Sequence, residues 1–259
     1  MKQSLFLGIA VVVTVVVAFM IYYLLLGDPS NFANGEVRTV PNNILGTVYT
    51  GGWVVPVLIT LTLLDLTLVF ERTFSLRKAN GRSSITSFLK SVQTNLMNGR
   101  IDDAIKACDA QRGSAANIIR TGLERYKVVA GDKKLDPEKR MAETQRAIEE
   151  ATSLETPLLE RNLIALSTIA STATMFGLLG TTIGMIRAFT ALARAGAPDA
   201  IQLSIGISEA LINTALGLLA AIIGIIAYNF FVTKVDNFTY MIDEASYNVV
   251  QILNTRTTD

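Results

Sequence analysis

The sequence has no histidine, one cysteine and few charged residues, and each shortage excludes a class of function. Without histidine there can be no His-ligated metal site and no imidazole acid–base chemistry. The single cysteine, Cys108, cannot form an internal disulfide, and no cysteine cluster suggests zinc or an iron–sulfur centre. There is also no glycine-rich phosphate loop. We therefore expect a protein that is not an enzyme and holds no metal or cofactor.

Charge is scarce as well. Only 17% of residues are charged, the net charge is +1, and half of the chain is hydrophobic. A nucleic-acid-binding protein would carry a basic excess to neutralise phosphate, so nucleic acid is not an expected partner. The composition is too apolar for an ordinary soluble domain and points to the lipid bilayer.

Long hydrophobic runs are what the sequence does have. About 20 helical residues cross a hydrocarbon core of about 30 Å. Four segments reach that length: Leu5–Leu26, Val48–Phe70, Leu163–Ile186 and Gln202–Val232. The first could be a signal peptide, but its apolar run exceeds the roughly 7–15 residues of a signal core and no A-x-A-like site follows, so we expect a retained helix. The predicted fold class is all-α, a polytopic membrane protein with four transmembrane helices.

Lysine and arginine predict the orientation. Residues 71–161 hold 17 of the 23 basic residues, Lys2, Lys234 and Arg256 add to the same side, and only Arg38, Arg187 and Arg194 remain for the other side. By the positive-inside rule both termini are cytoplasmic. The predicted organisation is an N-terminal transmembrane hairpin (1–70), a cytoplasmic helical region (71–162), a second transmembrane hairpin (163–233) and a cytoplasmic tail (234–259).

The cytoplasmic region is expected to be helical. Ile85, Phe88, Leu89, Val92 and Leu96 share one face of a helix over residues 84–98. Two short helices follow at 101–111 and 115–129. After a polar turn at 131–136, a charged helix starts at Pro137 and is expected to bend at Pro157.

The third hydrophobic segment is rich in small and hydroxyl residues. Ala170, Thr174, Gly177 and Thr181 share one helical face. Small residues let helix backbones approach closely, and hydroxyls can bond across a helix interface. The pattern predicts a packed face, although it is common to many helix pairs.

The fourth segment carries a carboxylate beside a stripe of small residues. Glu209 adjoins this stripe, and Asn213 follows one turn later; the stripe consists of Gly206, Ala210, Thr214, Gly217, Ala221 and Gly224. A charge deep in a bilayer costs roughly 2.5–3.5 kcal/mol on insertion scales, so Glu209 should face the bundle interior or a wet path. The residues alone leave two interpretations open: an ion pathway, or a structural glutamate near the membrane surface.

For Asp65 we favour a snorkelling, interfacial role over an ion site, and for Arg187 an interface anchor.

Together these two segments resemble the MotA/TolQ/ExbB proton channel family, and ExbB most of all. The resemblance rests on the run Thr168–Met185, the Glu209-Ala-Leu-x-x-Thr214 motif and the later pair Tyr228-Asn229. It covers residues 168–229 in the expected order and spacing.

The resemblance implies a ring-forming subunit, a homopentamer in the bacterial inner membrane around two copies of an ExbD-like single-span partner. It implies an ion pathway at Thr181, Glu209 and Thr214, with Thr174 and Asn213 as secondary polar lining. In the family the titrating aspartate belongs to the partner, so these side chains would line a path around it.

Two family prolines are replaced here, by Thr174 and Ile223, and a fourth span precedes the usual three of ExbB and TolQ.

For function, the resemblance implies proton-driven work delivered to a TonB-like protein for outer-membrane transport, with TolQ-like envelope maintenance or a MotA-like flagellar stator as alternatives. A self-contained secondary transporter and a structural membrane scaffold are alternative functions from other classes. Neither the ion (H⁺ or Na⁺) nor the cargo follows from the sequence.

Overall fold

The computed structural model describes residues 2–33, 38, 40–131, 135–193 and 199–258. These residues are nearly all helical, and the only β-type pairing among them is an isolated bridge between Phe32 and Pro41. The all-α prediction is therefore confirmed. The chain forms two compact units: Met1–Phe70 with Asn162–Asn229, and Glu71–Arg161 with Phe230–Asp259.

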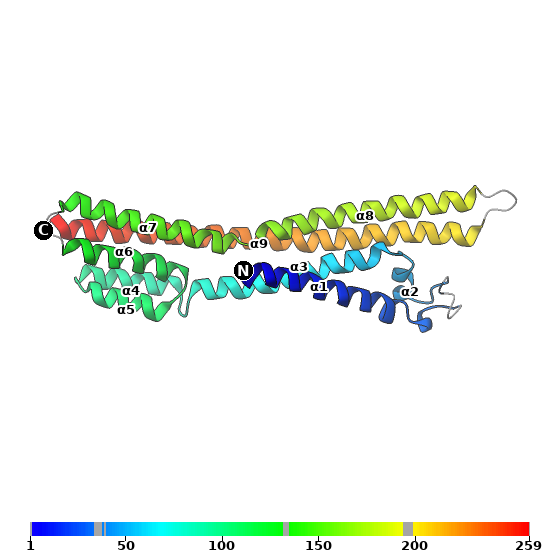
Figure 1. The fold of residues 1–259 in the computed structure, drawn as a ribbon, viewed down its shortest axis with the longest axis horizontal. Coiled ribbons are helices and arrows are strands. Elements are labelled where there is room, and N and C mark those ends of the chain that lie inside the picture. Colours follow the sequence, from blue (N-terminus) through cyan, green and yellow to red (C-terminus); the bar gives the residue numbers. More distant parts are fainter. Residues whose placement is uncertain (1, 34–37, 39, 132–134, 194–198, 259) are drawn as a thin grey trace. The chain divides into compact units, whose positions relative to one another are not determined.

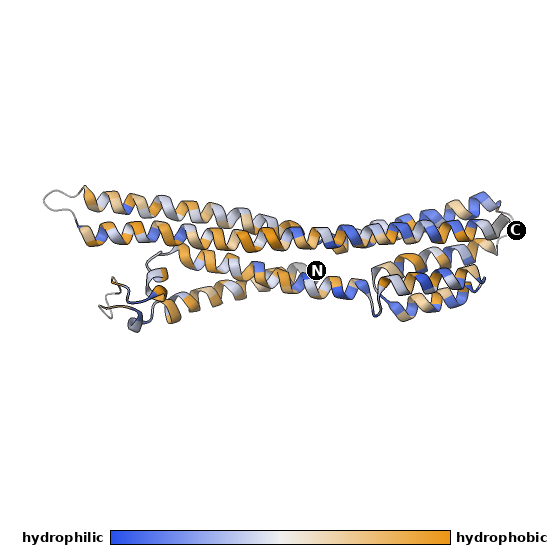
Figure 2. Ribbon diagram, turned by 180° about the vertical axis from the view of Figure 1, so that it is seen from behind, coloured by the Kyte–Doolittle hydropathy of each residue, from blue (hydrophilic) through white to orange (hydrophobic). Residues whose placement is uncertain are grey.

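The first unit contains the apolar helices. These are α1 (Lys2–Met20), which continues as the π-helical turn η1 (Ile21–Leu26), the first part of α3 (Val54–Asn80), α8 (Leu163–Leu192) and the first part of α9 (Ala200–Thr258). Four helices are long and apolar enough to cross a membrane, as the sequence predicted. Within the first unit, α8 and the first part of α9 lie side by side as an antiparallel hairpin (Figure 1). Both are mainly hydrophobic there (Figure 2).

The second span begins later than expected. The sequence predicted one helix from Val48, but the short helix α2 (Ile44–Tyr49) ends first and α3 starts only at Val54. Gly52 lies between them with φ of 74°, a backbone conformation that side chains disfavour. The Gly51-Gly52 pair is a turn signal inside a longer apolar run, and the prediction followed the length of that run instead. Before α2, a single 3₁₀ turn, η2 (Pro29–Asn31), follows η1.

The second unit is a helical bundle. It comprises α4 (Ile85–Met97), α5 (Ile101–Gln111), α6 (Ser114–Ala130) and α7 (Pro137–Glu160), together with the ends of α3 and α9. Its core includes Phe88, Val92 and Leu96 of α4, which confirms the predicted apolar face, and Val249 and Leu253 of α9. Figure 2 shows hydrophilic and hydrophobic residues interspersed along the helices of this unit.

The turn between α3 and α4 is held by one buried amide. Gln111 Oε1 accepts from the backbone N–H and hydroxyl of Ser83, at 3.1 and 2.5 Å. Its Nε2 donates to the carbonyls of Asn80 and Ser83, both at 2.9 Å. One side chain thereby satisfies several polar groups of a tight turn.

Pro137 starts α7, as predicted, and Pro157 lies inside it. The helix ends at Glu160, and Asn162, whose φ of 60° is left-handed, precedes α8. Part of the expected turn at 131–136 and Arg194 lie outside the described residues.

Candidate functional site

The α8–α9 hairpin is packed backbone against backbone. A Cβ added to Gly177 would lie 3.1 Å from the Cα of Gly217, and one added to Gly217 would lie 2.8 Å from the Cα of Gly177. Nearer the loop, a Cβ on Gly184 would lie 2.6 Å from the amide nitrogen of Ala210. Larger residues at these positions would push the helices apart, which explains the small residues that the sequence showed there.

Thr181 and Thr214 meet across this interface. Their hydroxyls contact each other, either one serving as donor. Each hydroxyl also lies 3.1 Å from a carbonyl of its own helix, Gly177 O for Thr181 and Ala210 O for Thr214. Since a hydroxyl donates one proton and accepts others, this pair can exchange donor and acceptor roles without moving either helix. Both side chains are partly buried.

Glu209 lies on a different face of α9. It is five residues from Thr214, which at 3.6 residues per turn rotates it by about 140°. Its side chain is 0% exposed, and Nη1 of Arg187 donates to its two carboxylate oxygens at 2.8 and 2.7 Å. The structure therefore brings Thr181 and Thr214 together and holds Glu209 in a separate, charge-paired position.

Arg187 is thus more than the interface anchor that the sequence suggested. Its side chain is 55% exposed, so the guanidinium joins a buried carboxylate to the surface of the unit. The two residues are 22 apart in the chain but equally far from residue 198 in the interhelical loop. An antiparallel hairpin brings such positions to the same level, and this was the signal that could have identified the pair.

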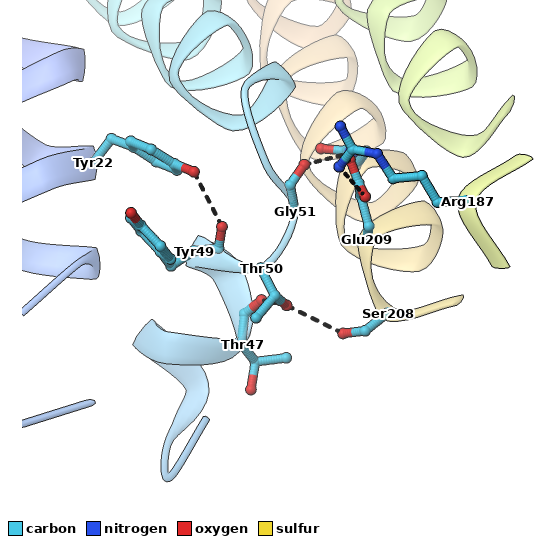
Figure 3. A network of polar contacts seen from close by, with 9 residues as sticks. Tyr22, Thr47, Tyr49, Thr50, Gly51, Arg187, Ser208 and Glu209 are labelled. Atoms are coloured by element: carbon cyan, nitrogen blue, oxygen red, sulfur yellow. Dashed lines mark hydrogen bonds and ion pairs between the residues drawn. The ribbon is translucent and has the colours of Figure 1, made fainter. Parts of the chain in front are cut away.

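The break before α3 covers Glu209 from the other side (Figure 3). A Cβ on Gly52 would lie 2.8 Å from Oε1 of Glu209. The carbonyl of Gly51 accepts from Asn213 Nδ2 at 2.9 Å, and Thr50 Oγ1 lies 3.4 Å from Ser208 Oγ. Asn213 thus faces this turn together with Glu209, rather than the threonine pair.

The N-terminal helix supports the same turn. The Tyr22 hydroxyl donates to the carbonyl of Tyr49 at 3.2 Å, and the two rings stack with centroids 4.6 Å apart. Tyr22, Leu26 and Val55 are buried in one cluster. The remaining predicted residue, Thr174, lies two helical turns from Thr181 on the same face of α8, and its hydroxyl donates to Ala170 O at 3.1 Å.

Asp65 does not snorkel to an interface, and that expectation is wrong. Its side chain is 0% exposed, and neither carboxylate oxygen has a hydrogen-bond partner among the described residues. It lies beside Gly224 of α9, where an added Cβ would be 2.9 Å from Oδ2. The sequence around Asp65 could not show that α8 and α9 pack against it. Within the described part of the chain, no three Asp, Glu, Cys or His side chains converge as a metal site would need.

Known proteins resemble the chain over this hairpin and beyond. The model of the MotA/TolQ/ExbB proton channel family matches residues 110–244. The Tol-Pal system protein TolQ of Pseudomonas aeruginosa is 28% identical over 201 residues, which cover 76% of this chain and 86% of that protein. A putative biopolymer transport protein ExbB-like 1 of Synechocystis is 31% identical over 73% of this chain and 71% of its own.

The biopolymer transport protein ExbB of Pseudomonas putida is 36% identical over 89 residues, which are 34% of this chain and 27% of that protein. The family match spans the glycine-packed hairpin, its threonine pair and the buried Glu209. With four apolar helices of membrane-spanning length, the chain is a multi-pass membrane protein. It belongs to the MotA/TolQ/ExbB proton channel family.

Proposed function

We propose that this protein is the ring-forming subunit of an ion-motive-force motor in the bacterial inner membrane. Five copies, the number that the family resemblance implies, surround an ExbD-like single-span partner and energise TonB-dependent outer-membrane transport. The proposal has two supports: membership of a proton channel family, and polar groups enclosed within an apolar hairpin.

The observation that carries this proposal is the threonine pair between α8 and α9. Hydroxyls that touch across an otherwise glycine- and alanine-lined interface can relay a proton or line a path for one. Glu209 and Arg187 add a charged pair nearer the loop. One elementary charge crossing 100 mV releases about 2.3 kcal/mol, so a ring of such faces would gain its work in small repeated steps.

Orientation follows from the basic residues. With 17 of 23 lysines and arginines between residues 71 and 161, the second unit lies in the cytoplasm, with both termini on that side. The Glu209–Arg187 pair, next to the α8–α9 loop, is then nearest the periplasm. The proton enters near this pair and passes the threonines toward the cytoplasm.

A TolQ-like role in envelope maintenance is the second candidate. It is favoured by the alignment with TolQ of Pseudomonas aeruginosa, which covers more of this chain than the alignment with ExbB of Pseudomonas putida does. Co-purification with the products of neighbouring genes separates the two. A TonB-like protein in the complex supports the ExbB-like role, and its absence beside a Tol-type partner supports the TolQ-like one.

The mechanism is tested by replacing the path residues. Thr181→Val, Thr214→Val and Glu209→Gln should each abolish energised uptake while the ring still assembles. Thr182→Val is the matched control, because the Thr182 hydroxyl is exposed and donates to carbonyls of its own helix, Leu178 O and Leu179 O. Full uptake in the three path variants would refute the motor hypothesis.

A further inference from the structure

Asp65 is a buried acid that the proposed pathway leaves unused. It lies on α3 and is enclosed by α8 and α9 of the same chain. A Cβ on the facing Gly224 would lie 2.9 Å from Asp65 Oδ2 and 2.9 Å from Ala170 Cβ. The space beside Ala170 therefore holds the carboxyl only because residue 224 has no side chain.

No counter-charge accompanies this carboxyl among the described residues of the unit. On the two helices packed against it, the ionisable side chains of this unit are Arg187 and Glu209, which pair with each other, and Tyr228. Further along α3, Arg72 pairs with Glu71. An ionised carboxylate buried without charge or hydrogen-bond partners is strongly disfavoured, so the enclosed form is the neutral acid.

Asp65 also lies at one end of the polar stripe that Thr174, Thr181 and Thr214 form along the hairpin. Gly224 is fifteen residues beyond Glu209 on α9, about 22 Å at 1.5 Å per residue. Gly52 contacts Glu209, and Asp65 is thirteen residues beyond Gly52, about 20 Å along the chain if helical throughout. The two estimates are similar, and Thr174 donates to the carbonyl of Ala170, whose Cβ lies on the same side of Gly224 as Asp65 Oδ2.

We propose that Asp65 is a second proton-binding carboxyl of this protein, at the end of the polar stripe opposite Glu209. The inference rests on the proposed function for the direction of flow: Asp65 takes up a proton from the stripe and releases it toward the cytoplasm. No bond other than O–H forms or breaks, and no co-reactant is needed. A hard cation would require several oxygen ligands, and among the described residues no three Asp, Glu, Cys or His side chains converge there.

The first test is chemical and does not depend on transport. Dicyclohexylcarbodiimide reacts with protonated carboxyls in apolar surroundings, and mass spectrometry of the purified full-length chain locates the adduct. We expect Asp65 to be labelled, with labelling falling as pH rises from about 5 to about 9, and Asp65→Asn to remove the adduct. Absence of labelling at every pH, or protection by Na⁺ at fixed pH, would overturn the proposal.

The second test measures proton flux through the complex with its single-span partner in liposomes. Asp65→Asn should lower the flux about tenfold or more, equivalent to about 1.4 kcal/mol in the barrier, whereas Asp65→Glu keeps a carboxyl and should retain most of it. Thr62→Val is the control, because the Thr62 hydroxyl donates to Leu58 O of its own helix.

The outcomes separate the two proposals. Wild-type flux in Asp65→Asn, with Glu209→Gln inactive, would refute the role of Asp65 and leave the motor intact. No flux in the wild-type complex would refute the motor, while the labelling still decides whether Asp65 binds a proton. If Asp65→Asn does not assemble, the flux of Asp65→Glu and the pH dependence of labelling decide between a proton-binding and a purely structural carboxyl.

Discussion

The Arg187–Glu209 pair should respond asymmetrically to the loss of either partner. Glu209 is 0% exposed and Arg187 is 55% exposed. Arg187→Met strands a carboxylate in the interior, where breaking a buried pair costs about 3–5 kcal/mol. Because about half of the Arg187 side chain is exposed, we expect screening to weaken the ion pair and to reduce the destabilisation by Arg187→Met to about 2 kcal/mol.

Glu209→Gln should be milder. It leaves a guanidinium that water can reach and an amide oxygen that can still accept a hydrogen bond, so we expect a cost of about 0.5 kcal/mol. In the double variant neither charge is stranded, and its cost should be smaller than the sum of the two single changes. The cycle therefore yields a coupling of about 1–2 kcal/mol.

The assay is reversible unfolding of the purified chain in mixed micelles titrated with a denaturing detergent, followed by helix content. All four members of the cycle are compared under one set of conditions. Equal costs for the two single substitutions, or costs that simply add in the double variant, would show that the pair does not carry the burial of Glu209.

Two further predictions concern packing and reactivity. Gly217→Val should destabilise the hairpin by about 2 kcal/mol or more, since a Cβ there lies 2.8 Å from Ala173 O, whereas Gly8→Val, with nothing within 4 Å, should change unfolding by less than about 0.5 kcal/mol. Burial raises the pKa of the Cys108 thiol to about 12, so the folded protein should resist maleimide at about pH 8 and react only on unfolding. Equal unfolding midpoints for the two glycine variants would contradict the packing prediction. Rapid alkylation of Cys108 in the folded chain would contradict the reactivity prediction.

Much of the fold followed from sequence because it depends on local patterns. Hydrophobic length identified four spans, and the spacing of Phe88, Val92 and Leu96 identified the buried face of α4. The break at Gly52 was missed, although the Gly51-Gly52 pair is a turn signal, because the prediction rested on the length of the apolar run.

The site was harder to predict, because its contacts join residues that are distant in the chain. The small-residue stripes suggested that Thr181 and Thr214 lie between packed helices, where the structure has them in contact. The same patterns did not pair Glu209 with Arg187 or enclose Asp65, since those arrangements depend on which helices become neighbours. Their roles in ion flow stay predictions.

The stacked rings of Tyr22 and Tyr49 give the additional N-terminal span a purpose besides anchorage. Through them, the first helix braces the backbone segment that seals Glu209 from one side. Deleting residues 1–26 would remove this support from the turn that covers Glu209. The burial of the Glu209 carboxylate thus depends on a helix that contributes no charge to it.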